Sequence, residues 1–136
     1  MKKFAILIPL LFVMITCAQD PLLGQWERFG DEAEGAIVVV EKVGDVYQGK
    51  LLKPVGMLTE LGFTQNEIKW RDMEPVGDDK WRGQDLIKVV DFDGSILSAD
   101  YDDVYFTKLE KDVLEVRKFA KGTEIIGTVQ KWRRIK

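Results

Sequence analysis

The chain has 136 residues, a length typical of one domain. Its 20 Lys and Arg residues stand against 23 Asp and Glu residues, which gives a net charge of −3. This acidic balance argues against a nucleic-acid partner, because a nucleic-acid binder presents a strong basic patch. It also argues against attachment to anionic lipid headgroups by charge alone.

The first 18 residues have the pattern of a secretory signal peptide. Two lysines precede an apolar run over residues 4–15, which is shorter than the roughly 20 residues needed to span a bilayer. The small residues around Cys17 favour cleavage after Ala18, so that the exported protein would begin at Gln19. The alternative is a lipoprotein, cut before Cys17 and anchored through its acylated thiol. We therefore predict an exported protein, periplasmic or extracellular, with the lipid-anchored form left open.

Residues 19–136 are predicted to form a single domain. Once residues 1–18 are removed, 18 positive residues face 23 negative ones, a net charge of −5 that suits a soluble surface. Residues 19–136 contain no cysteine, so the domain depends on its hydrophobic core rather than on disulfides.

Short apolar runs rich in Val, Ile, Tyr, Phe, Trp and Thr alternate with turn signals along this domain. The predicted strands span residues 24–29, 36–43, 46–53, 64–72, 81–90, 95–101, 104–110, 113–120 and 124–135. The turns between them include Gly44-Asp45, Gly77-Asp78-Asp79, Asp93-Gly94, Asp102-Asp103, Lys111-Asp112 and Lys121-Gly122. Residues 57–63 are predicted to form one helical turn closed by Gly62, because glycine tolerates the left-handed conformation that ends a helix.

Strands of this length joined by tight turns predict an all-β protein with an antiparallel meander and at most one short helix. A sheet of eight or nine strands leaves exposed edges unless it closes on itself or splits into two packed layers. Closure would give a small barrel that holds either a side-chain core or one small ligand.

Tryptophan and arginine recur together. Trp70, Trp81 and Trp132 are each followed by an arginine, and neighbours in a strand point to opposite faces. We therefore expect these tryptophans to point inward and the arginines that follow them to point outward.

A second spacing concerns the two ends of the domain. Trp26 and Arg28 lie two residues apart, as do Trp132 and Arg134, so each pair shares one face of a strand. In a closed meander the first and last strands are neighbours. An arginine from one strand then lies over a tryptophan from the other, a cation–π contact of roughly 0.5–2 kcal/mol. We expect Gly24, Trp26, Trp132 and Arg134 to form this end of the barrel.

Gly24-x-Trp26 and Trp132-x-Arg134 look like the closed-end signature of lipocalin-like barrels. The wider pattern resembles, divergently, an uncharacterised family of small exported bacterial proteins that is classed as a domain of unknown function. The family's central Asn-Pro loop is absent from this chain. The resemblance implies a lipocalin-like barrel and a location in the cell envelope. The matching stretches are Leu23–Trp26, Tyr47–Leu51, Leu114–Arg117 and Gly127–Arg134.

The acidic residues of 91–94 and 100–103 flank one predicted strand. Carboxylate clusters of this kind can bind calcium, but the spacing does not match a calcium loop. We expect Asp93 and the Asp102-Asp103 pair to stabilise hairpin turns through their backbone neighbours, and we predict no metal site.

The chain has no histidine, and Cys17 is its one cysteine. This composition excludes Ser-His-Asp and Cys-His nucleophile pairs and His or Cys zinc sites. Chemistry near neutral pH would need a carboxylate, a buried lysine or a tyrosine with a shifted pKa. We predict no catalytic residue and no cofactor, and we expect that the protein is not an enzyme.

Two function classes follow. The favoured one is a non-catalytic binding module for a small apolar or amphipathic ligand in the envelope. The other is a structural or interaction protein, whose filled barrel docks on an envelope partner. Small residues and isolated polar groups inside the barrel would favour the first, and an interior packed with Trp, Phe and Leu would favour the second. Neither the ligand nor the oligomeric state is determined by the residues.

Overall fold

The structure of the protein is a computed structural model, which describes residues 20–120, 123–124 and 129–136. Among the strands described, eight close into one antiparallel barrel, because β1 pairs with β9 and β6 pairs with β7. The short β8 pairs only with β7. This confirms the predicted all-β fold and the closed meander. The strands are β1 (Gly24–Phe29), β2 (Ile37–Val43), β3 (Val46–Lys53), β4 (Ile68–Gly77), β5 (Lys80–Val90), β6 (Ile96–Leu109), β7 (Val113–Ala120), β8 (Thr123–Glu124) and β9 (Gln130–Arg134).

The one helix described is α2 (Met57–Glu60), between β3 and β4. Gly62 closes this helical turn as predicted, in the left-handed conformation with a φ of 85°. The Gly62 N–H donates to the Thr59 carbonyl and the Phe63 N–H to the Leu58 carbonyl, each at 3.0 Å. This pair of bonds is the Schellman arrangement, which satisfies two carbonyls at the helix end.

One predicted turn is wrong. Asp102 and Asp103 lie inside β6, which runs without interruption from Ile96 to Leu109 and replaces the two predicted strands 95–101 and 104–110. They pair with Asp85 and Gln84 of β5, so a cross-strand partner overrides the local turn preference of two adjacent aspartates.

Other predicted boundaries shift. β4 begins at Ile68 and continues to Gly77, beyond the predicted span of 64–72. The predicted final strand 124–135 is described as β8 and β9, with residues 125–128 outside the described part of the chain. The predicted turn at residues 121–122, the signal peptide and Cys17 also lie outside it.

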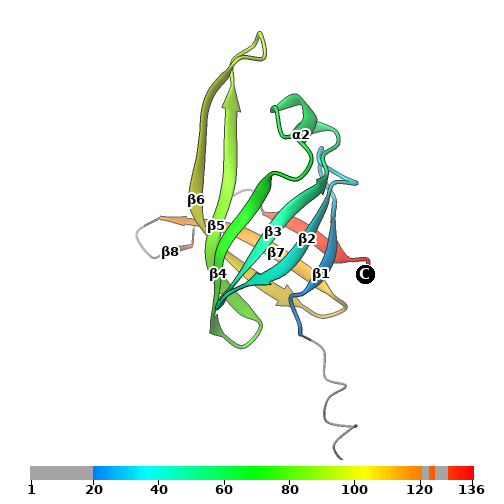
Figure 1. Ribbon diagram of the computed structural model, residues 1–136, viewed down its shortest axis with the longest axis vertical. Coiled ribbons are helices and arrows are strands. Elements are labelled where there is room, and N and C mark those ends of the chain that lie inside the picture. Colours follow the sequence, from blue (N-terminus) through cyan, green and yellow to red (C-terminus); the bar gives the residue numbers. More distant parts are fainter. Residues whose placement is uncertain (1–19, 121–122, 125–128) are drawn as a thin grey trace, which may run out of the picture.

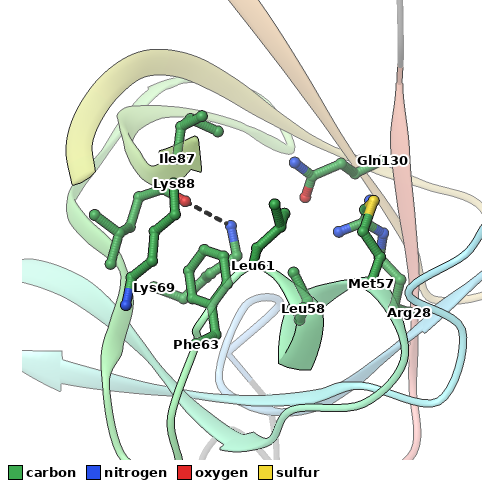
Figure 2. Close-up of a pocket in the computed structure, with 10 residues that line it drawn as sticks. Arg28, Met57, Leu58, Leu61, Phe63, Lys69, Ile87, Lys88 and Gln130 are labelled. Atoms are coloured by element: carbon green, nitrogen blue, oxygen red, sulfur yellow. Dashed lines mark hydrogen bonds between the residues drawn. The ribbon is translucent and has the colours of Figure 1, made fainter. Parts of the chain in front are cut away.

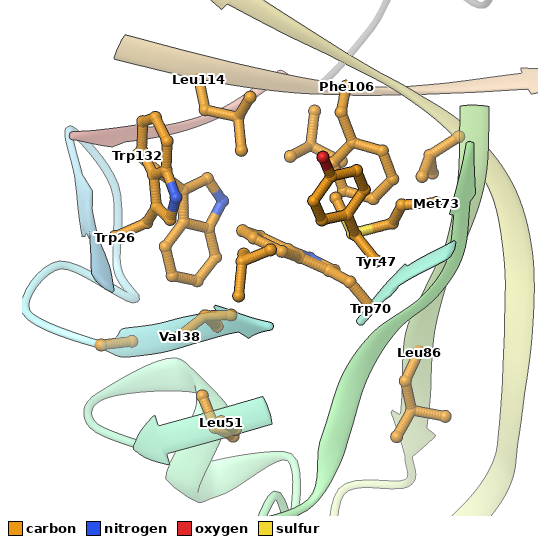
Figure 3. Close-up of a cluster of buried hydrophobic side chains, with 14 of the residues drawn as sticks. Trp26, Val38, Tyr47, Leu51, Trp70, Met73, Leu86, Phe106, Leu114 and Trp132 are labelled. Carbon is orange, nitrogen blue, oxygen red and sulfur yellow. The ribbon is translucent and has the colours of Figure 1, made fainter. Parts of the chain in front are cut away.

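The barrel core is aromatic (Figure 3). Trp26, Trp70 and Trp132 are fully buried. The Trp70 ring meets Phe106 and Trp132 edge to face, with ring centres 5.2 and 4.9 Å apart. Such pairs each contribute about 0.5–1.5 kcal/mol beyond the burial of their area. The arginines that follow Trp70, Trp81 and Trp132 are exposed, so the predicted inward and outward alternation is confirmed.

The two ends of the barrel differ (Figure 1). At one end β1 begins and β9 ends; at the other lie α2 and the long β5–β6 hairpin, which projects beyond the remaining strands. No helix within the described residues is long and apolar enough to cross a membrane.

Candidate functional site

Pairing of β1 with β9 brings the predicted barrel-end residues together. Trp26 lies opposite Arg134, and Arg28 lies opposite Trp132. The Arg134 guanidinium carbon is 4.5 Å from the centre of the Trp26 ring, and that of Arg28 is 5.4 Å from the Trp132 ring. Each strand therefore supplies an arginine to the tryptophan of the other.

Arg134 closes its end of the barrel. Its Nη1 donates to the Leu23 carbonyl and its Nη2 to the Pro21 carbonyl. Gly24 lies beside it with a φ of 126°, and a Cβ at Gly24 would overlap the Lys136 carbonyl oxygen. These contacts give Gly24 and Arg134 a structural role at the closed end.

The segment before β1 is fastened over the same end. The Trp26 indole N–H donates to the Leu22 carbonyl at 3.0 Å, and Leu22 is fully buried. The Tyr47 hydroxyl donates to the Asp20 carboxylate at 2.5 Å. Burial raises the pKa of Asp20, but the hydrogen bonds from Tyr47 and from the backbone of Leu22 and Leu23 outweigh it and hold that pKa below its ordinary value. These bonds hold the segment before β1 across this end of the barrel. A separate hollow of about 320 Å³ lies there, lined by Asp20, Leu23, Gly24, Arg134 and Lys136.

At the opposite end, a β-bulge turns a lysine inward. β3 and β4 pair at Gly49 with Trp70 and at Lys50 with Ile68, so Lys69 is an extra residue on β4. A bulge of this kind redirects a side chain and breaks the alternation of the strand. Lys69 is consequently buried next to the buried Trp70, with 2% of its surface exposed.

Lys69 belongs to a buried polar group. Its Nζ donates to Asp85 Oδ1 at 2.5 Å and to the Leu86 carbonyl at 3.0 Å. The Gln130 amide donates to the other oxygen of Asp85 at 3.0 Å, and its own oxygen accepts from the Trp132 indole at 3.3 Å. This network connects β4, β5 and β9 across the inside of the barrel.

Arg28 completes the polar group on the β1 side. Its Nε and Nη2 donate to Asp31 Oδ2 at 2.9 and 2.6 Å, and its side chain is almost wholly buried. No hydrogen bond of Arg28 Nη1 occurs within the described residues. The second end of the guanidinium therefore has capacity to bind a further acceptor.

A hollow lies between these polar groups and α2, and we call it the α2 cavity (Figure 2). It consists of two adjoining spaces of about 70 and 250 Å³. Arg28, Met57, Ile87 and Gln130 line both spaces, and Figure 2 shows the residues around the smaller one. Its apolar walls come from Met57, Leu58, Leu61, Phe63, Leu86, Ile87, Val104 and Val116, and its polar lining from Arg28, Lys69, Asp85, Lys88, Asp102, Lys118 and Gln130.

Two lysines of this polar lining form ion pairs of their own, separate from the buried group around Lys69 and Asp85. Lys88 Nζ lies 2.8 Å from Glu67 Oε2, and Lys118 Nζ lies 2.8 Å from Asp102 Oδ2. Burial raises the pKa of Glu67, but the hydrogen bond from Lys88 and the bonds from Thr64 outweigh it, so the pKa of Glu67 lies below its ordinary value. Glu67 and Asp102 therefore act as counter-ions to the two lysines.

The lysine inside the cavity has unusual surroundings. Burial lowers the pKa of Lys69, and although the Asp85 carboxylate acts in the opposite direction, the positive charge of Arg28 lowers it further. The Phe63 ring lies 5.0 Å from Lys69 Nζ and 4.9 Å from Lys88 Nζ. Lys69 and Asp85 thus form an ion pair in which both side chains are almost wholly buried, with exposed fractions of 2% and 1%.

The acidic residues of the β5–β6 turn bind their own backbone. Asp91 Oδ1 accepts from the N–H groups of Asp93 and Ser95 at 3.1 Å, and Asp93 Oδ1 accepts from Ser95 at 2.9 Å. The predicted turn role of Asp93 is confirmed. Within the part of the chain that the structure describes, no three His, Cys, Asp or Glu side chains are arranged to hold a metal ion.

The α2 cavity was not predicted from the sequence. Lys69 precedes Trp70 directly, and strict alternation would place it outside the barrel. Asp85 and Gln130 carry no motif. Arg28 is the exception, because its spacing from Trp26 predicts that it shares the inward face.

Comparison with known proteins finds no relative of this chain. No family model, curated protein or solved structure matches the chain. The resemblance to the exported family of unknown function therefore stays a prediction.

Proposed function

We propose that the protein is an exported envelope binding module that holds a small amphipathic ligand in the α2 cavity. One observation carries this proposal: a wall of apolar side chains faces a buried polar group made of Arg28, Lys69, Asp85 and Gln130. Ligand pockets commonly combine apolar walls with a few polar groups that fix orientation.

The size of the hollow supports a small ligand. An engineered cavity of about 150 Å³ in another protein accommodates benzene, and the larger space of the α2 cavity has about 250 Å³. Arg28 Nη1 is the donor best placed to receive an anionic or carbonyl group, because the other guanidinium nitrogens bond Asp31. The ligand's apolar part would then lie along Met57 and Ile87.

Native mass spectrometry of protein purified from its own envelope tests this proposal. Wild-type protein should carry a small bound molecule, and Ile87→Trp should lose it because the larger side chain fills the hollow. Val43→Trp is the matched control, since Val43 is 49% exposed and is the last residue of β2, far along the strand from the α2 cavity. Absence of any ligand from the wild type, or its retention by Ile87→Trp, would count against the proposal.

A second candidate function is docking on an envelope partner through the β5–β6 hairpin. Phe92 at its tip is fully exposed, and Val89, Ile96 and Leu97 are each about half exposed or more. A photo-crosslinking residue at position 92 should join one envelope protein in the producing cell, while the same residue at Leu109 should not. Crosslinks of equal yield at both positions would remove this candidate.

A further inference from the structure

Lys69 is the lysine of the α2 cavity whose carboxylate partner is also fully buried, and it lies against an apolar wall. Its Nζ lies 2.5 Å from Asp85 Oδ1, and the Phe63 ring lies 5.0 Å away. The β-bulge holds the lysine in this position, so its burial follows from the backbone and not from a flexible rotamer.

We propose that Lys69 captures small aldehydes with an apolar body as a covalent imine in the α2 cavity. This inference rests on the proposed binding function, because the same walls would hold the aldehyde. It assigns a chemistry to the cavity that the binding proposal alone does not contain.

The condensation needs no other reactant. Asp85 takes a proton from the Lys69 ammonium, and the free amine attacks the aldehyde carbon. A C–N bond forms while the C=O π electrons move to oxygen, which receives the second proton of the nitrogen. Asp85 returns its proton to that hydroxyl, water leaves, and the nitrogen lone pair closes the C=N bond. The products are one protonated imine and one water, so charge and atoms balance.

The surroundings favour both the amine and the product. Desolvation in an apolar pocket activates a lysine for imine formation, because it increases the fraction of neutral amine. Burial lowers the pKa of Lys69 in this way. The protonated imine keeps a positive charge, which Asp85 would neutralise as counter-ion. The Gln130 amide donates to the second oxygen of Asp85 at 3.0 Å. This bond would keep the carboxylate in place when the Lys69 amine becomes an imine.

Lys88 is a natural internal control. It lines the same cavity, its side chain is 8% exposed, and it lies at a similar distance from Phe63. Its carboxylate partner Glu67 has a side-chain exposure of 26%, against 1% for Asp85. Lys88 therefore has a more hydrated ion pair, and we expect less imine formation at Lys88 than at Lys69.

Reductive trapping tests the proposal on the wild-type protein. The protein is mixed at neutral pH with a limiting amount of benzaldehyde and cyanoborohydride, and the benzyl group is mapped by peptide mass spectrometry. Lys69 should carry more of the label than any exposed lysine, because burial lowers its pKa and so raises its fraction of neutral amine. Lys88→Met should keep the label on Lys69. Labelling spread over exposed lysines, or concentrated on Lys88, would overturn the proposal.

A parallel titration with octanoate separates this inference from the function on which it rests. Octanoate binds only non-covalently. Octanoate binding without a benzyl group on Lys69 overturns the imine and leaves the binding function standing. A benzyl group on Lys69 without octanoate binding supports the imine and counts against the amphipathic ligand.

Discussion

Arg134 illustrates how one side chain can hold several segments together. Its guanidinium covers the Trp26 ring and donates to the carbonyls of Pro21 and Leu23. Its Nε lies 3.4 Å from Asp112 in the β6–β7 turn. The contact with Trp26 could be predicted because it depends only on spacing and on the adjacency of the first and last strands. The carbonyl partners lie before β1 and have no such pattern.

A double-mutant cycle measures this contact. Arg134→Ala and Trp26→Leu should show a coupling energy of about 0.5–3 kcal/mol in denaturant unfolding, the range for residues in contact. Arg133→Ala is the control, because Arg133 is half exposed, pairs with Glu27 and lies over Phe29. Its effect should add to that of Trp26→Leu. Additive effects for Arg134 as well would contradict the closed-end geometry.

The bond between Tyr47 and Asp20 predicts a stability difference that depends on pH. The hydrogen bond to Asp20, with a contribution from burial, raises the pKa of Tyr47 to about 12. A raised folded-state pKa contributes stability below the unfolded value, about 10, and this contribution is lost as pH rises through the folded value. Asp20 has a lowered pKa, so its share is present above about pH 4 and is lost on acidification through its folded value.

Tyr47→Phe should therefore be less stable than the wild type by about 1.5–3 kcal/mol near neutral pH, the usual size for a hydrogen bond to a charged group. The difference should shrink between about pH 10 and 12, and also below about pH 4. Denaturation midpoints of both proteins across this range give the measurement. A difference that stays constant up to pH 12 would show that the phenol and the carboxylate do not interact.

β3 packs closely against Trp70 at Gly49. A Cβ on Gly49 would lie 2.7 Å from the Trp70 ring and 2.8 Å from a Val38 methyl, closer than real Cβ contacts. Gly49→Ala should therefore destabilise the barrel by about 1–3 kcal/mol, the usual cost of overpacking. Gly77→Ala is the control, because a Cβ there meets nothing within 4 Å. Equal unfolding free energies for the two variants would mean that Trp70 does not pack on β3 as described.

The bounds of a strand could be predicted where its local sequence pattern agrees with its pairing to neighbouring strands. β1, β2, β3, β5 and β7 begin or end within one residue of their predicted bounds. The failure at Asp102 and Asp103 has a clear cause, since their pairing partners lie nearly 20 residues earlier in β5. Local turn propensity carries no information about such partners.

The bulge at Lys69 could not be predicted for a related reason. It arises from the relative register of β3 and β4, which a single strand does not determine. The interior lysine, and with it the polar group of Asp85 and Gln130, depends on that register. Alternation along the strands therefore predicts the barrel, but it does not predict the candidate site inside it.

For the whole molecule, the interior has two parts. The half toward the closed end is filled by Trp26, Trp70, Phe106 and Trp132, the kind of packing expected of a structural barrel. The half under α2 contains the α2 cavity and its buried charges, the kind of interior expected of a binding module. The interior therefore has one part typical of a binding module and one part typical of a structural protein. Composition does not show where these residues lie in the barrel, so it did not separate the two function classes.

Tryptophan indole N–H signals test whether the α2 cavity binds an amphipathic ligand. The Trp132 indole donates to Gln130, which lines the cavity, whereas the Trp26 indole donates to Leu22 at the closed end. In ¹H–¹⁵N spectra of the purified protein titrated with octanoate, the Trp132 signal should shift progressively while the Trp26 signal stays in place. A shift of the Trp26 signal with the Trp132 signal unchanged, or no shift of either signal, would show that octanoate does not bind in the α2 cavity.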